Sequence, residues 1–145
     1  MVFLLMVLLF AGVIVPAETL TPTYSSSISP GGIEGGLGTI QSGGASVTIT
    51  PTSISAISDS ASTECVGIIT WTPSMPVTAT LTFDYRIESS GSNFVIWAAD
   101  WFGQTFEYTN GKVKTFSQSF DITDQIVVSI KAKNGRVSIS NISVR

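Results

Sequence analysis

The sequence contains no histidine and only one cysteine, Cys65, in 145 residues. Histidine is the side chain that most often acts as a general base and the one that most often binds a metal ion. A single cysteine allows neither an intrachain disulfide nor a cysteine-based zinc site. These absences argue against most classes of enzyme, and we expect a protein that is not an enzyme and has no cofactor and no metal.

Charge is also scarce. Charged residues make up 12% of the chain, which is about half the usual share. Only seven residues are Lys or Arg and the net charge is −3, so the basic stripe typical of a nucleic-acid-binding protein is missing and we expect no nucleic-acid partner. Apolar residues reach 43%, which excludes disorder by composition, and Ser and Thr together number 38. The length fits one domain with its own core.

Residues 1–15 form the one long apolar run, MVFLLMVLLFAGVIV. As a helix it would span roughly 22 Å, which is short for a bilayer core of about 30 Å and typical of the apolar part of a signal peptide. Val15, Pro16 and Ala17, followed by Glu18, fit a small-residue cleavage site. Because no basic residue precedes the run, a retained membrane anchor or a filament-core helix stays open as an alternative. Both readings predict an extracellular, cell-surface or virion-surface location.

Residues 18–45 read as a flexible linker. The stretch 16–46 contains three Pro, seven Gly and a Ser triplet, residues that disfavour helix and are typical of spacers. An alternative is that this segment becomes ordered against a neighbouring subunit. The sequence thus divides into an apolar signal or anchor segment (1–17), the linker (18–45) and a folded domain (46–145).

From Ser46 onward the apolar residues recur with a period of two, which indicates β-strands with one buried face. In 77–87 the residues Leu81, Phe83 and Tyr85 share one face, while Thr80, Thr82 and Asp84 share the other. Strands are expected at 46–50, 53–57, 64–71, 77–87, 93–99, 104–109, 113–122, 125–132 and in the last ten residues. About eight short antiparallel strands separated by turn signals predict an all-β sandwich of the jelly-roll type, preceded by the apolar N-terminal helix and the linker.

The last strand contains a change of phase. Val137 and Ile139 occupy odd positions, whereas Ile142 and Val144 occupy even ones. One extra residue near Ser140 and Asn141 would keep all four side chains on the buried face. The pattern therefore predicts a β-bulge at this point.

The runs TLTFDYRIESSG and NGKVKTFSQSFDITDQIVVSIKAKNGRVSISNISV follow each other in the order found in carbohydrate-binding modules. Over about 46–145 the chain resembles these galactose-binding-like jelly-roll domains, which occur on secreted glycosidases and on phage tail proteins. The resemblance implies a β-sandwich and a non-catalytic binding role. The family often has Asp before the final Asn, where this chain has Ser140, so a structural cation site of that kind is not expected here.

Aromatic residues gather in 94–108, which holds six of the chain's fourteen. An aromatic face can stack on the C–H face of a sugar while polar neighbours take its hydroxyls. We expect Trp101 at an exposed loop tip beside Asp100 and Gln104, and propose these three with Tyr108 as ligand-binding residues. Phe94, Trp97 and Phe106 are expected to fill the core, although Trp97 has the opposite parity to Phe94.

Other candidate sites are weaker. A glycosidase needs two carboxylates across a cleft, and Asp100 with Glu107 lies in what reads as an exposed hairpin. Asp121 and Asp124 are too few oxygen donors for a calcium site. Cys65 is expected to be a buried small hydrophobic residue, with an intermolecular disulfide as the alternative. The sequon at Asn141 is read as a chance match within the last strand.

Two functions follow from these observations. The first is a structural or adhesive subunit of an extracellular assembly, such as a surface filament or a virion, whose partners are copies of itself. The alternative is a secreted or membrane-tethered carbohydrate-binding module. In either case residues 1–15, if uncleaved, would contact a membrane.

Overall fold

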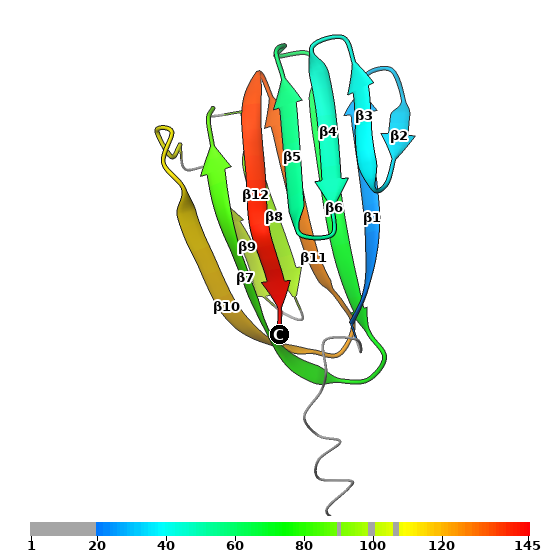
Figure 1. Ribbon diagram of the computed structural model, residues 1–145, viewed down its shortest axis with the longest axis vertical. Coiled ribbons are helices and arrows are strands. Elements are labelled where there is room, and N and C mark those ends of the chain that lie inside the picture. Colours follow the sequence, from blue (N-terminus) through cyan, green and yellow to red (C-terminus); the bar gives the residue numbers. More distant parts are fainter. Residues whose placement is uncertain (1–19, 90, 99–100, 106–107) are drawn as a thin grey trace, which may run out of the picture.

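The computed structural model describes residues 20–89, 91–98, 101–105 and 108–145, which form a β-sandwich of two six-stranded antiparallel sheets (Figure 1). Sheet A has the order β2 (Ile33–Gly35), β1 (Leu20–Ser29), β6 (Glu64–Pro73), β11 (Ile126–Lys133), β8 (Asn93–Ala98) and β9 (Trp101–Thr105). Sheet B has the order β10 (Lys114–Ile122), β7 (Val77–Ile87), β12 (Gly135–Val144), β5 (Ser53–Ser58), β4 (Ala45–Thr50) and β3 (Gly38–Ser42). The prediction of an all-β sandwich is confirmed, with twelve strands in the described residues rather than about eight.

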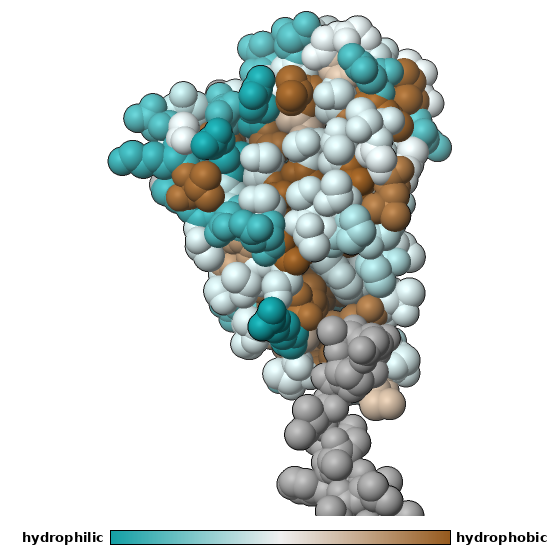
Figure 2. Space-filling model, in the orientation of Figure 1, coloured by the Kyte–Doolittle hydropathy of each residue, from teal (hydrophilic) through white to brown (hydrophobic). Residues whose placement is uncertain are grey.

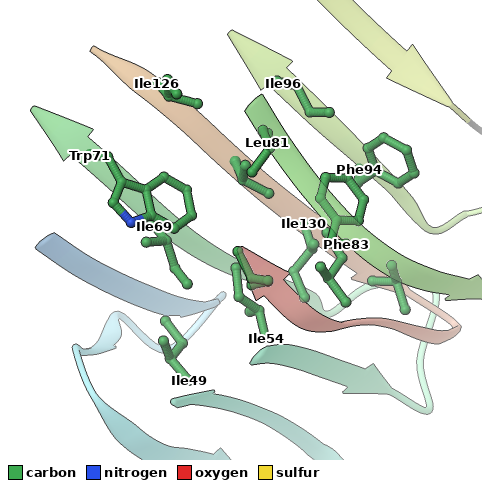
Figure 3. Packing of buried hydrophobic residues seen from close by; sticks show 14 of the residues in the cluster. Ile49, Ile54, Ile69, Trp71, Leu81, Phe83, Phe94, Ile96, Ile126 and Ile130 are labelled. Carbon is green, nitrogen blue, oxygen red and sulfur yellow. The ribbon is translucent and has the colours of Figure 1, made fainter. Parts of the chain in front are cut away.

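Strand β7 has the two faces that its alternation predicts. Leu81 and Phe83 are fully buried and Tyr85 is half-buried, while Thr80, Thr82 and Asp84 lie on the outer face. The same alternation in β11 and β12 sends a second and third row of Ile and Val inward. These rows from the two sheets meet in one hydrophobic core, shown from close by in Figure 3.

An aromatic group fills the core between β7, β8 and β10. The Phe83 ring stacks on Phe116 with centroids 5.0 Å apart and meets Phe94 edge-on at 5.3 Å. Tyr85 contacts Phe94 edge-on at 4.7 Å. Such offset and edge contacts are the geometries that aromatic pairs favour, so they hold this end of the two sheets together.

The predicted bulge in β12 is confirmed. The pairing of β12 with β7 shifts register between Ser140 and Ser143, and Asn141 adopts a positive φ of 53°. The shift keeps Ile139 and Ile142 both buried, as a single extra residue should. The Asn141 side chain is exposed and donates a hydrogen bond to Asp84 on the outer face of sheet B at 2.9 Å.

The prediction of a linker over 18–45 is wrong for residues 20–42, which contain strands β1, β2 and β3. Strand β1 pairs with β6 along all of its ten residues and buries Leu20, Ser26 and Ile28. The composition misled because Ser and Thr accept the extended backbone as readily as a loop, and the Gly residues are used at turns instead: Gly31 and Gly32 have positive φ directly after β1. The expected apolar helix in 1–17 lies outside the described residues.

The outer face of sheet B is rich in Ser and Thr hydroxyl groups. Side chains from neighbouring strands pair across it, for example Thr80 with Ser119 at 2.7 Å and Thr39 with Thr48 at 2.9 Å. Figure 2 looks onto this face and shows mostly pale side chains of intermediate hydropathy. The described residues contain no helix long and apolar enough to cross a membrane.

Candidate functional site

The outer face of sheet A differs from that of sheet B because it carries large apolar side chains. They border a groove of about 360 Å³ that crosses β6, β11, β8 and β9. Its lining residues are Ile68, Val95, Trp97, Phe102, Val127 and Ser129. All six positions point away from the core; Trp97 and Phe102 are exposed and the other four are half-buried.

Trp97 and Phe102 form the aromatic side of this groove. They lie directly opposite each other on β8 and β9, with ring centroids 5.5 Å apart and planes inclined at 54°. Trp97 is 57% exposed and Phe102 is 53% exposed. Alternation explains their direction, because Phe94 and Ile96 on the same strand face the core and Trp97 must then face outward.

A second, smaller hollow of about 150 Å³ lies against the same tryptophan. It is lined by Trp97, Ala98, Asp124, Gln125 and Val127. Asp124 and Gln125 come from the exposed segment between β10 and β11, and they give this hollow a carboxylate and an amide. The two hollows share Trp97 and Val127, so one ligand can contact an aromatic face, an apolar wall and hydrogen-bonding groups together.

The expectation that Trp101 stands at a loop tip is wrong. Trp101 is the first residue of β9, pairs with Ala98, and faces the inside of the sandwich. Its ring meets Phe120 at 5.3 Å and Phe116 at 6.0 Å, both on β10 of the other sheet. Gly103 leaves room for it, since any side chain there would collide with the Trp101 ring. Trp101 therefore bridges the edge strands of the two sheets.

Trp97, rather than Trp101, is the exposed tryptophan of this segment. Of the three aromatics expected in the core, Phe94 is buried, Trp97 is not, and Phe106 lies outside the described residues. The signal that would have identified Trp97 is its parity, opposite to that of Phe94 and Ile96. Parity alone did not decide which of the two sets faces the core.

The other predicted ligand-binding residues are not all together. Gln104 lies exposed on β9 opposite Val95, on the same outer face as the groove. Tyr108 is 55% exposed but is not among the residues that line either hollow. It precedes Thr109, which hydrogen-bonds Ile87 at the end of β7. Asp100 lies outside the described residues.

The titratable groups in the described residues make no catalytic constellation. Asp84 accepts hydrogen bonds from Asn141 and Thr115, which lower its pKa, and it lies on sheet B rather than near the groove. Cys65 is buried, and burial raises the pKa of its thiol, as expected for a structural cysteine. No cluster of three or more His, Cys, Asp or Glu side chains capable of holding a metal ion occurs in the part of the chain that the structure describes.

No protein-family model matches the sequence, and a search of curated proteins finds no similar sequence. Among solved structures, the enzymatically active domain of tailspike protein 4 from bacteriophage CBA120 matches with a TM-score of 0.54 and 8% identity over 82% of this chain. The match spans only 19% of the tailspike chain. A family 29 carbohydrate-binding module complexed with mannohexaose matches over 87% of this chain and 91% of its own, with a TM-score of 0.44 and 13% identity. A CBM4 module matches over 70% of this chain with a TM-score of 0.42. At these identities the likeness is one of fold.

Proposed function

We propose that the sandwich is a non-catalytic carbohydrate-binding domain whose ligand stacks on Trp97. The observation that carries the proposal is the exposed pair of Trp97 and Phe102 beside a groove, with hydrogen-bonding groups next to it. A contiguous exposed apolar patch, here Trp97 and Phe102 with the groove beside them, marks an interaction site on a sheet face. The flat apolar face of a sugar ring suits the indole, and Asp124 and Gln125 suit its hydroxyls.

The acidic side chains at the site are consistent with binding rather than hydrolysis of a sugar. Hydrolysis of a glycosidic bond uses two carboxylates at a fixed separation. Among the described residues that line the two hollows, Asp124 is the one carboxylate. Gln104 joins the site as an additional polar group on the same face, whereas Trp101 stabilises the fold beneath it.

The proposal is tested by comparing two exposed aromatics in a glycan-binding assay. Trp97→Ala should weaken binding at least 30-fold, the loss typical of a buried tryptophan contact. Tyr108→Ala is the matched control, because Tyr108 is equally exposed but lies away from the groove. The measurement is affinity electrophoresis or titration against a panel of soluble polysaccharides. Loss of binding in Tyr108→Ala with Trp97→Ala unaffected would contradict the proposal and move the site to Tyr108.

A second candidate is a structural or adhesive subunit of an extracellular assembly. The observation that favours it is the hydroxyl-rich face of sheet B, where charged residues such as Asp84 and Asp121 are few and copies of the chain would meet little charge repulsion. Residues 1–15 would then contact a membrane or a neighbouring copy at a cell or virion surface. Sedimentation of the full chain separates the two candidates, since an assembly subunit must self-associate and a binding module need not.

A further inference from the structure

We propose that the two hollows together select neutral sugars in which a methyl group stands in place of the hydroxymethyl group, that is, 6-deoxyhexoses. The inference rests on the proposed carbohydrate-binding function and names the ligand class of that same site. It starts from the contrast between the hollows, which meet at Trp97 and Val127 but differ in chemistry. A ligand that contacts both must have an apolar part and a hydroxylated part.

The larger hollow can offer very few hydrogen bonds. Of the six described side chains that line it, five are aliphatic or aromatic, and Ser129 supplies the one side-chain hydroxyl among them. A sugar hydroxyl placed against Ile68, Val95 or Val127 would lose its water without gaining a partner, which costs binding free energy. A methyl group at the same place gains from leaving water. The groove therefore favours the edge of a sugar that carries a methyl group.

The smaller hollow complements the rest of the ring. Asp124 accepts and Gln125 both accepts and donates, so a pair of sugar hydroxyls can be satisfied beside Trp97. These groups fix which edge of the ring faces the polar hollow. The opposite edge then lies over the apolar groove.

Charge at the site disfavours acidic sugars. The Asp124 carboxylate would repel the carboxylate of a uronic acid, and no Lys or Arg is among the described residues that line either hollow. Lys131 lies on the same face of β11, but its ammonium faces Glu64 at 4.0 Å. The expected ligand is therefore neutral as well as methyl-bearing.

The test uses sugars that differ at one position. Methyl α-L-fucoside and methyl α-L-galactoside have the same stereochemistry and differ by one methyl for one hydroxymethyl, as do methyl α-L-rhamnoside and methyl α-L-mannoside. Each is titrated into the full ¹⁵N-labelled chain while the indole N–H signal of Trp97 is followed, with Trp97→Phe to assign it. The deoxy sugar of at least one pair should bind about fourfold tighter, because its methyl group enters the groove without the desolvation cost of an unpartnered hydroxyl.

Variants test whether the sugar preference depends on the groove lining rather than on the fold as a whole. Val95→Thr keeps the shape but adds a hydroxyl to the groove, and it should reduce the preference to below twofold. Val66→Thr is the control on the same face, because Val66 does not line either hollow, and it should keep the wild-type preference. Asp124→Asn should bring the affinity for methyl β-D-glucuronide up to that for methyl β-D-glucoside.

The outcomes distinguish this inference from the function on which it rests. Equal affinities within every pair, or tighter binding of the hydroxylated sugar, would overturn the deoxy-sugar selectivity while leaving sugar binding intact. No shift of the Trp97 indole with any sugar in the polysaccharide or monosaccharide series would overturn both. A Trp97 shift that depends on protein concentration alone would assign the groove to a second copy and overturn both as well.

Discussion

At the residue scale, two tryptophans four positions apart have opposite roles. Trp97 on β8 faces outward beside the groove, and Trp101 on β9 faces inward against Phe116 and Phe120. The reversal follows from the pairing of β8 with β9, since Ala98 and Trp101 pair directly and must share a face. Ala98 is buried, so Trp101 is directed to the inside.

The two tryptophans should therefore separate stability from binding. Trp101→Ala removes a large side chain that joins the edges of the two sheets, and it should lower the free energy of unfolding by about 3 kcal/mol. Trp97→Ala removes an exposed ring, and it should lower that free energy by less than about 1 kcal/mol. Urea denaturation of both variants measures the difference. Equal losses would mean that Trp97 is also part of the structural core.

At the element scale, the bulge of β12 depends on a backbone conformation that most residues avoid. Asn141 has a φ of 53°, in the left-handed region where side chains with a branched Cβ are strained. The bulge lets Ile139 and Ile142 both reach the core although their sequence positions differ in parity. Its conformational cost thus falls on one exposed residue.

A pair of substitutions isolates this cost. Asn141→Gly and Asn141→Val both remove the hydrogen bond to Asp84, so their difference reports the backbone alone. The glycine variant should be more stable than the valine variant by about 1–2 kcal/mol. Thermal or urea unfolding gives the comparison. If valine were as stable as glycine, the register shift would have to occur at another residue.

The sequence predicts the strands whose alternation is strong and misses those where it is weak. Strand β7 was predicted with its observed bounds, because Val77 to Ile87 alternates without interruption. Strand β1 was missed since its inward row includes Tyr24 and Ser26 beside Ile28, a pattern that composition presents as a spacer. Its strand character comes from pairing with β6, which lies more than thirty residues later.

Prediction of the candidate site from sequence is limited in the same way. Two sets of alternating residues were recognised around Trp97, but which set faces the core depends on the neighbouring strands β11 and β9. Asp124 and Gln125 come to Trp97 only because β11 pairs with β8, which local sequence does not reveal. Gln104 was predicted as a ligand-binding residue beside Trp101, but the structure places it on the opposite face of β9, the face of the groove, and its role in binding stays a prediction.

At the scale of the whole molecule, the folded unit includes residues that the sequence assigned to a linker. Strand β1 covers the edge of β6 along ten residues, and β3 extends sheet B beyond β4. Leu20 and Ile28 belong to the core cluster. The sandwich is therefore not complete at Ser46.

Truncation tests this boundary. A chain that begins at Leu20 should unfold cooperatively, whereas one that begins at Ser46 should lose cooperative unfolding or aggregate, because the β6 edge and the core beneath it are uncovered. Circular dichroism during heating and size-exclusion chromatography report the two behaviours. A cooperative, monomeric 46–145 fragment would show that β1 to β3 are accessory to the fold.

The position of β12 has a consequence for the order in which the protein assembles. This strand is the last in the chain, yet it lies in the interior of sheet B between β7 and β5. During synthesis β7 emerges roughly 50 residues before its partner is complete, an interval of about 2–10 s at ribosomal rates. Sheet B can therefore close only after β12 has been made, and until then β7 and β5 each keep an unpaired edge that is prone to aggregate.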